Sequence, residues 1–112
     1  MEIDILLEYS SRKKLRGWLE KNAGSATHCW VACYRGKVPK EGAVPYLVLV
    51  EECLCFGWID STCKSLPDGR LAQRISPRRK KSHWTELNKQ RCHDLEARGL
   101  MTDAGRQALA NS

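Results

Sequence analysis

With 112 residues, 42% of them hydrophobic, and a net charge of +6, the chain fits one soluble domain with a modest core better than a disordered segment. Its start, MEIDILLEYS, is acidic and lacks the apolar region of a secretion signal, and its longest uncharged apolar stretch, residues 42–50, is far shorter than a membrane-spanning helix. We therefore expect a single cytoplasmic domain over residues 1–112.

The positive charge is concentrated in one part of the chain. Residues 64–91 contain nine Lys or Arg against two Asp or Glu, a net charge of +7, whereas residues 1–63 balance eight against eight. Four of the nine cations are consecutive, at residues 78–81. Clustered charge of one sign is typical of proteins that bind an anionic partner, so the sequence favours such a partner.

The first predicted helix covers residues 12–22 and begins after Ser10 or Ser11, either of which can cap it. Its apolar side chains recur at helical spacing, at Leu15, Trp18 and Leu19. Four cations crowd its first turns, and the sequence leaves open whether they form a solvated face or add to an anion-binding surface: Arg12, Lys13, Lys14 and Arg16.

A strand is predicted over residues 27–35, because its side chains alternate. One face is apolar and the other contains the aromatic residues: Cys29, Val31 and Cys33 against Trp30, Ala32 and Tyr34. This pattern indicates a strand covered on both sides.

The second predicted helix covers residues 46–56 and ends at Gly57, which suits a left-handed terminus. Most of its residues are apolar, so we expect it to be the most buried helix of the domain. Only Glu51 and Glu52 are expected to require water.

A β-hairpin follows Gly57. Residues 67–69, Pro-Asp-Gly, fit a three-residue loop with a type I turn and a left-handed glycine. This loop predicts four opposing pairs: Leu66 with Arg70, Lys64 with Ala72, Thr62 with Arg74, and Asp60 with Ser76. One face is then polar and basic (Asp60, Thr62, Lys64, Arg70, Arg74) and the other apolar (Ile59, Cys63, Leu71, Ile75). We also expect Asp60 to form an ion pair with Arg74.

Two helices are predicted after Pro77, which ends the hairpin. Ser82 can cap the first, over residues 83–98, whose inner face would combine Trp84, Leu87 or Asn88, Cys92 and Leu95. Thr102 can cap a short last helix. Because residues 100–112 are polar and Leu109 is their one strong apolar contact, we expect this tail to fray.

The six cysteines do not predict a metal site. Their spacings are C-x3-C, C-x-C and C-x7-C, with no Cys-x2-Cys pair, and the three histidines form no H-x3-5-H pair. We expect reduced thiols that behave as small hydrophobes, and neither a metal nor a cofactor.

Several motifs together resemble the YdeI/OmpD-associated family. They are WLEKN (18–22), CWVACYR (29–35), CFGWID (55–60), RISPR (74–78), SHWTELN (82–88) and GLMTDAG (99–105), and they span roughly residues 10–108 in the same order. The resemblance implies the YjbR/CyaY-like superfamily, with an α+β domain whose helices pack on a small antiparallel sheet around a central hairpin. It also implies a role related to bacteriocin protection, and a branch of the superfamily is described as suited to DNA binding.

The first functional hypothesis is a non-catalytic module that binds nucleic acid or another polyanion. Its contacts would come from the hairpin face and the basic run after it: Lys64, Arg70, Arg74, Arg78, Arg79, Lys80 and Lys81. Trp84 could stack on a base if it is exposed. No set of base-reading side chains is visible, so binding should tolerate any sequence.

Two alternatives remain open. The resemblance implies an accessory in bacteriocin or antimicrobial stress that acts through an acidic protein or an envelope partner. The other is small-molecule binding or catalysis at a pocket near Trp58, Asp60, Trp84 and Asn88. An acid, a base and a nucleophile could be drawn from Asp60, His83 and Cys63 or Cys55, but no spacing makes them converge, so the sequence favours a binding protein.

Overall fold

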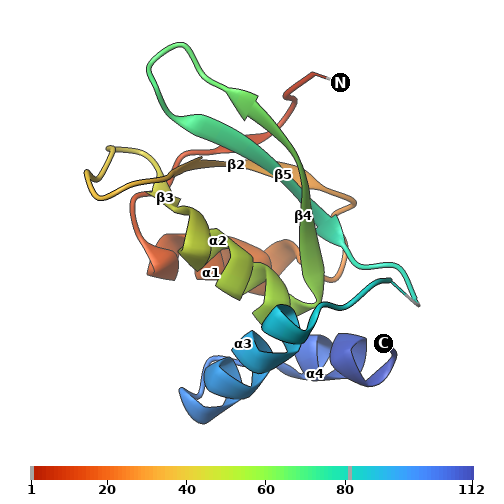
Figure 1. Cartoon of the computed structure of the whole chain (residues 1–112). Helices are drawn as coiled ribbons and strands as arrows, with labels where there is room; N and C mark the ends of the chain where they lie inside the picture. Colours follow the sequence, from red (N-terminus) through yellow and green to blue (C-terminus); the bar gives the residue numbers. More distant parts are fainter. Residues whose placement is uncertain (1, 81) are drawn as a thin grey trace.

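In the computed structural model, which describes residues 2–80 and 82–112, strands and helices are interspersed along the first half of the chain, and two helices come last (Figure 1). The strands are β1 (Leu6–Leu7), β2 (Cys29–Tyr34), β3 (Val44–Pro45), β4 (Trp58–Ser65) and β5 (Leu71–Pro77). The helices are α1 (Arg12–Asn22), α2 (Tyr46–Phe56), α3 (Glu86–Ala97) and α4 (Asp103–Ala110). Lys81, one of the predicted polyanion-binding residues, lies outside the described residues.

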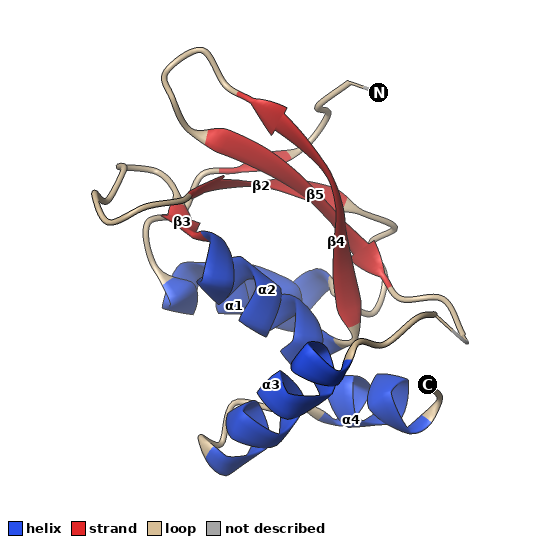
Figure 2. Cartoon of the chain, viewed as in Figure 1, coloured by secondary structure: helices blue, strands red, loops and turns tan. Residues whose placement is uncertain are grey.

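The strands form one sheet in the order β1-β2-β5-β4, with β3 paired to the end of β2. The long strands β2, β5 and β4 are antiparallel, whereas the two-residue strands β1 and β3 each run parallel to β2. Figure 2 shows the helices gathered on one side of this sheet. The predicted α+β class is confirmed, and the short parallel strands make the sheet mixed.

The two central helix predictions are confirmed to the residue. The side chain of Ser11 caps α1 by accepting a hydrogen bond from the backbone N–H of Lys14, at 3.3 Å. Helix α2 ends at Gly57, whose φ of +73° is the left-handed conformation that favours glycine. Eight of the eleven residues of α2 are buried, so it is the central helix of the domain.

Helix α3 begins three residues later than predicted. Thr85, not Ser82, caps it by accepting a hydrogen bond from the backbone N–H of Asn88, at 3.1 Å. Leu87 is 58% exposed and so does not lie on the inner face, whereas Asn88, the alternative at this place, is half-buried; the buried residues of α3 are Cys92 and Leu95. Cap preference favours Ser82 at least as much as Thr85, so it could not predict the later start. The Oγ of Ser82, the carbonyl of His83 and the ring of Trp84 all contact Arg78, which holds these three residues outside the helix.

The hairpin loop forms as predicted. The backbone N–H of Leu66 donates to the carbonyl of Arg70 at 2.8 Å, and Gly69 has a φ of +92°. Lys64 lies opposite Ala72, also as predicted. Near the loop, local turn chemistry therefore sets the register.

Farther from the loop, a β-bulge between Asp60 and Cys63 changes the register by one residue. The buried side-chain amide of Gln73 stabilises this bulge, since its Nε2 donates to the carbonyls of Ser61 (3.0 Å) and Thr62 (3.3 Å). Gln73 thus supplies hydrogen bonds to two backbone carbonyls of the bulge that do not pair with the neighbouring strand.

The bulge overturns part of the predicted hairpin. Asp60 lies opposite Ile75 on the helix-covered face, instead of opposite Ser76 on the basic face. Its Oδ2 accepts a hydrogen bond from the hydroxyl of Tyr46, at 2.7 Å. The predicted Asp60–Ser76 pairing and the Asp60–Arg74 ion pair are therefore wrong.

The C-terminal tail packs on α2 where fraying was predicted. Thr102 caps α4 and donates its hydroxyl to the carbonyl of Cys55. Gly105 is buried so closely that a Cβ added there would lie 2.4 Å from the same carbonyl oxygen. The tail therefore packs on α2 through the close approach of the Gly105 backbone to the end of that helix. Ala108 and Leu109 are half-buried beside this contact.

The core contains most of the cysteines. Cys29, Cys33, Cys53, Cys55 and Cys92 are buried as free thiols, as predicted for small hydrophobes, whereas Cys63 is exposed. The prediction that β2 is covered on both sides is also confirmed, because Cys29 through Cys33 are all fully buried.

Candidate anion-binding surface

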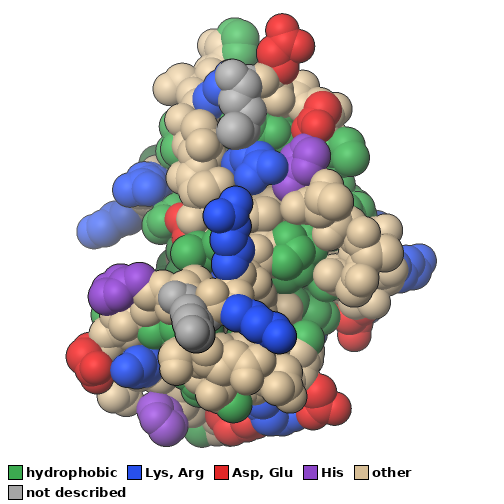
Figure 3. Space-filling model, turned by 90° about the vertical axis from the view of Figure 1, so that its right-hand side faces the viewer, with side chains coloured by type: hydrophobic (Ala, Val, Ile, Leu, Met, Phe, Trp, Pro, Cys, Tyr) green, Lys and Arg blue, Asp and Glu red, His purple; other side chains and the backbone are tan. Residues whose placement is uncertain are grey.

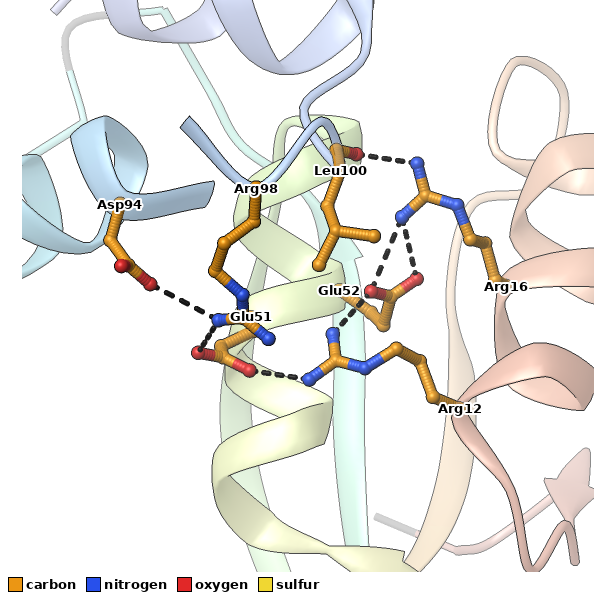
Figure 4. Close-up of polar contacts among 7 residues, drawn as sticks. All are labelled: Arg12, Arg16, Glu51, Glu52, Asp94, Arg98 and Leu100. Carbon is orange, nitrogen blue, oxygen red and sulfur yellow. Dashed lines mark hydrogen bonds and ion pairs between the residues drawn. The ribbon is translucent and has the colours of Figure 1, made fainter. Parts of the chain in front are cut away.

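Three arginines are committed to a buried ion network between helices (Figure 4). The carboxylate of Glu52, which is fully buried, accepts hydrogen bonds from Arg12 at 2.7 Å and Arg16 at 3.1 Å. Glu51 accepts from Arg12 at 2.5 Å and from Arg98 at 3.0 Å. The expectation that Glu51 and Glu52 require water is therefore wrong.

This network answers the open question about the first turns of α1 for two of the four cations there, Arg12 and Arg16. Arg12 and Arg16 point toward α2, and Arg16 makes a further hydrogen bond to the carbonyl of Leu100 (Figure 4). Their charge is balanced inside the domain, so they do not contribute to an external anion-binding surface.

Arg70, a predicted polyanion contact, is likewise paired. Its guanidinium lies 2.8 Å from the carboxylates of both Asp68 and Glu8 and donates to the carbonyl of Gly42 at 3.0 Å. Its side chain is only 15% exposed. The sequence could not show this, because Glu8 comes from the far end of the chain.

Lys64 and Arg74 lie on the sheet face turned away from α1 and α2. Lys64 is opposite Ala72 on β5, and Arg74, two residues further along the same strand, is opposite Trp30 on β2. The ammonium of Lys64 lies 5.8 Å from the centroid of the Trp30 ring, which is fully buried beneath these residues.

Arg78 begins the loop after β5 and is held in a defined position. Its guanidinium carbon lies 4.0 Å from the centroid of the Trp84 ring, and its backbone N–H donates to the carbonyl of Gly57 at 3.0 Å. Its Nη1 has only long contacts of 3.4 Å, to Ser82 Oγ and the carbonyl of His83. Its buried Nε has no hydrogen-bond partner.

The charge of Arg78 is partly withdrawn from water without a carboxylate partner. Burial lowers the pKa of Arg78, and this effect outweighs the more distant acidic groups of Cys53, Cys92 and Asp60. An arginine nevertheless remains charged in proteins, so an incoming anionic oxygen would meet a positioned cation.

We call five cations the basic strip: Lys64, Arg74, Arg78, Arg79 and Lys80. Arg79 and Lys80 are exposed. In the part of the chain that the structure describes, the side chains of Arg74, Arg79 and Lys80 make no ion pair. Figure 3 shows Lys and Arg side chains one below another along this side of the molecule, with acidic side chains mostly toward its edges.

None of the four residues of the predicted small-molecule pocket lines either of the two surface grooves described below. Trp58 is buried against Trp18, with ring centroids 6.1 Å apart, and Trp84 lies beneath Arg78. Asp60 binds Tyr46, and Asn88 accepts a hydrogen bond from Arg91 at 3.1 Å.

The structure, which describes both residues, shows no contact between the acid and the base considered for catalysis. Among the described residues, no hydrogen bond joins Asp60 to His83, and Asp60 is committed to Tyr46. The same residues contain no group of three or more His, Cys, Asp or Glu that could hold a metal ion.

Two surface grooves have other linings. One, of about 500 Å³, combines cations with acids: Glu8, Lys40, Glu41, Gly42, Asp68 and Arg70. The other, of about 580 Å³, follows α1 and was not predicted: Tyr9, Ser11, Lys13, Lys14, Gly17, Trp18, Lys21 and Asn22. The signal in the sequence was a glycine between lysines at helical spacing.

None of the described helices is long and apolar enough to cross a membrane. The sequence profile of a family described as "Domain of unknown function (DUF8412)" matches residues 7–108. No curated protein and no solved structure matches the chain.

Proposed function

Because the chain belongs to a family of domains of unknown function (DUF8412), we propose its function from its own geometry: it is a non-catalytic module that binds nucleic acid along the basic strip. The observation that carries this proposal is the difference between two sets of cations. Arg12, Arg16, Arg70, Arg98 and Arg106 all pair with carboxylates of the domain. The cations of residues 74–80 have no such partner among the described residues.

The position of Arg78 supports phosphate binding in particular. The guanidinium of Arg78 makes only long, neutral contacts through Nη1, so its Nη groups have donors left for an anionic oxygen. Stacking on Trp84 restricts the side chain before binding, so less conformational entropy is lost when a phosphate is engaged.

The proposed binding is to the nucleic-acid backbone. Trp84 is only 8% exposed and is covered by Arg78, so it does not offer a face for a base to stack on. Arg74, Arg79 and Lys80 would contact phosphates by charge, which carries no sequence information. We therefore propose binding to duplex and single-stranded DNA that depends on salt and tolerates any sequence.

Fluorescence-anisotropy titrations with labelled duplex DNA across a salt series test this proposal. If the five cations of the strip each engage one phosphate, the slope of log K against log salt is about −4.5. The triple substitution Arg74→Gln, Arg79→Gln, Lys80→Gln should bring the slope to about −1.8. This variant keeps Arg78, so the packing of Trp84 is not disturbed.

A second triple variant controls for total charge. Lys13→Gln, Lys14→Gln, Lys21→Gln also lowers the net charge from +6 to +3, but its three lysines lie along α1. For this control variant, the slope of log K against log salt should stay close to that of the wild-type chain. An equal loss of DNA affinity and salt slope in the two variants would mean that net charge alone attracts DNA. If the wild-type chain does not bind DNA even at low salt, the proposal is refuted.

A further inference from the structure

The groove along α1 is a second place where cations gather without acids. Of the eight described residues that line it, three are lysines and none is acidic. In the described part of the chain Lys13, Lys14 and Lys21 make no ion pair, in contrast to Arg12 and Arg16 on the inner side of the same helix. One face of α1 is thus neutralised by α2, and the other has three uncompensated charges.

The groove exists because position 17 has no side chain. Lys14, Gly17, Trp18 and Lys21 are spaced as neighbours along one stripe of the helix. A Cβ added to Gly17 would meet no atom within 4 Å. Glycine in a helix interior costs about 1 kcal/mol relative to alanine, and no close packing in the domain requires it here.

The groove also has aromatic side chains in fixed positions. Trp18 is half-buried and packs edge-on against Trp58, at an interplanar angle of 86°. The amide of Asn22 donates to the carbonyl of Trp18 at 2.8 Å, which holds the end of the helix beside it. Tyr9, half-buried on the same core, adds a second ring to the lining.

We propose that this groove binds a small planar aromatic anion, that is, one ring system with a phosphate or carboxylate group. The ring would lie in the hollow at Gly17 against Trp18 and Tyr9, where rings gain from stacking and edge contacts. The lysines would surround the anionic group. The volume of about 580 Å³ lies within the range of small-molecule sites.

This site is separate from the basic strip, and the proposal does not depend on nucleic-acid binding. Its residues belong to α1 and the segment before it, whereas the strip belongs to β4, β5 and the following loop. Either proposal can therefore fail without the other.

Two-dimensional NMR titrations of the ¹⁵N-labelled chain provide the test. The probes are AMP and 2-naphthoate, which combine a ring with an anion, adenosine, which has the ring alone, and inorganic phosphate. We expect at least one of AMP and 2-naphthoate to shift the Gly17 amide and the Trp18 indole signals, with adenosine and phosphate binding about tenfold or more weakly. A response to AMP alone identifies a nucleotide site, and a response to both identifies a general aromatic-anion site.

Substitution at the hollow provides the matched control. Gly17→Gln should weaken binding about tenfold without lowering the unfolding temperature, because the new side chain occupies the groove while its Cβ meets no atom within 4 Å. Gly24→Gln, where an added Cβ also meets no atom within 4 Å, lies outside the lining and should bind normally. The proposal is overturned if neither aromatic anion shifts the groove signals, if phosphate alone binds as well, or if Gly17→Gln leaves binding unchanged.

Discussion

Glu52 of α2 and Arg12 of α1 form an ion pair of 2.7 Å across 40 residues of chain, and the Glu52 side chain is fully buried. Arg16 shares the same carboxylate, so two guanidinium groups surround one buried acid. Because a buried carboxylate is costly without such partners, this arrangement fixes how α1 packs on α2.

Removal of Glu52 should therefore destabilise the domain strongly. Glu52→Ala leaves two partly buried arginines short of an acceptor and a cavity beside α2, so we expect a loss of about 3–5 kcal/mol in the free energy of unfolding. Urea denaturation measures it. Glu20→Ala, at an exposed position of α1, should change stability by no more than about 0.5 kcal/mol. Similar losses in both variants would contradict the buried network.

Two helical glycines should respond in opposite ways to the same substitution. Gly105→Ala places a Cβ 2.4 Å from the carbonyl oxygen of Cys55 and 2.5 Å from the sulfur of Met101, so α4 must move away from α2. We expect a loss of roughly 1–3 kcal/mol, as for other overpacked sites. Gly17→Ala meets no neighbour and should stabilise the chain by about 1 kcal/mol. Thermal unfolding of both variants checks the pair, and stabilisation by Gly105→Ala would show that α4 is not packed this closely.

Only one cysteine should react rapidly with a thiol reagent in the native state. Cys63 is exposed, whereas burial raises the pKa of Cys29 to about 12 and those of Cys33 and Cys55 to about 11. Reaction with Ellman's reagent near neutral pH should thus show one fast thiol, which the Cys63→Ser variant lacks. All six should react in denaturant. Several fast thiols in the native chain would argue against the buried cysteine core.

Tyr46 should lose its proton late in an alkaline titration. Burial, and then its hydrogen bond to Asp60, raise the pKa of Tyr46 to about 12 from a usual value of 10.0. The folded state therefore holds this proton more tightly than the unfolded chain. The resulting stabilisation is fully present below pH 10 and is lost as the pH rises toward 12.

The phenolate absorbance of the wild-type chain should include a step near pH 12 that Tyr46→Phe lacks. Tyr34→Phe, which leaves the Asp60 contact in place, should retain that step. A titration in which Tyr46→Phe changes nothing near pH 12 would show that the contact is not maintained in solution.

Much of the secondary structure follows from local chemistry that can be recognised in the sequence. The bounds of α1 and α2, the left-handed Gly57 and the Pro-Asp-Gly loop were all predicted, because caps and turns involve residues within a few positions of one another. The predicted α+β class is also confirmed, because it depends only on which segments form helices and which form strands. The resemblance to the YdeI/OmpD-associated family and the bacteriocin-related role stay predictions.

The candidate surfaces were decided by contacts between distant parts of the chain. From the sequence, Arg70 and Arg74 are equivalent members of one basic run, but Glu8 pairs only with the first. The bulge at Asp60 depends on Gln73 of the neighbouring strand, and it moves a predicted surface acid to the helix-covered face. A net charge of +7 in one segment was visible in advance, yet which of its charges remain available was not.

The sequence by itself determined where α1, α2 and the hairpin loop form and where positive charge accumulates, since these depend on neighbouring residues. Only the tertiary structure decided which cations are neutralised, which glycine is a packing contact and which opens a groove. Pairing between α1 and α2, and between the first residues and the hairpin loop, requires the chain to fold back on itself. Charge can be counted along a sequence, whereas its compensation depends on distances in space.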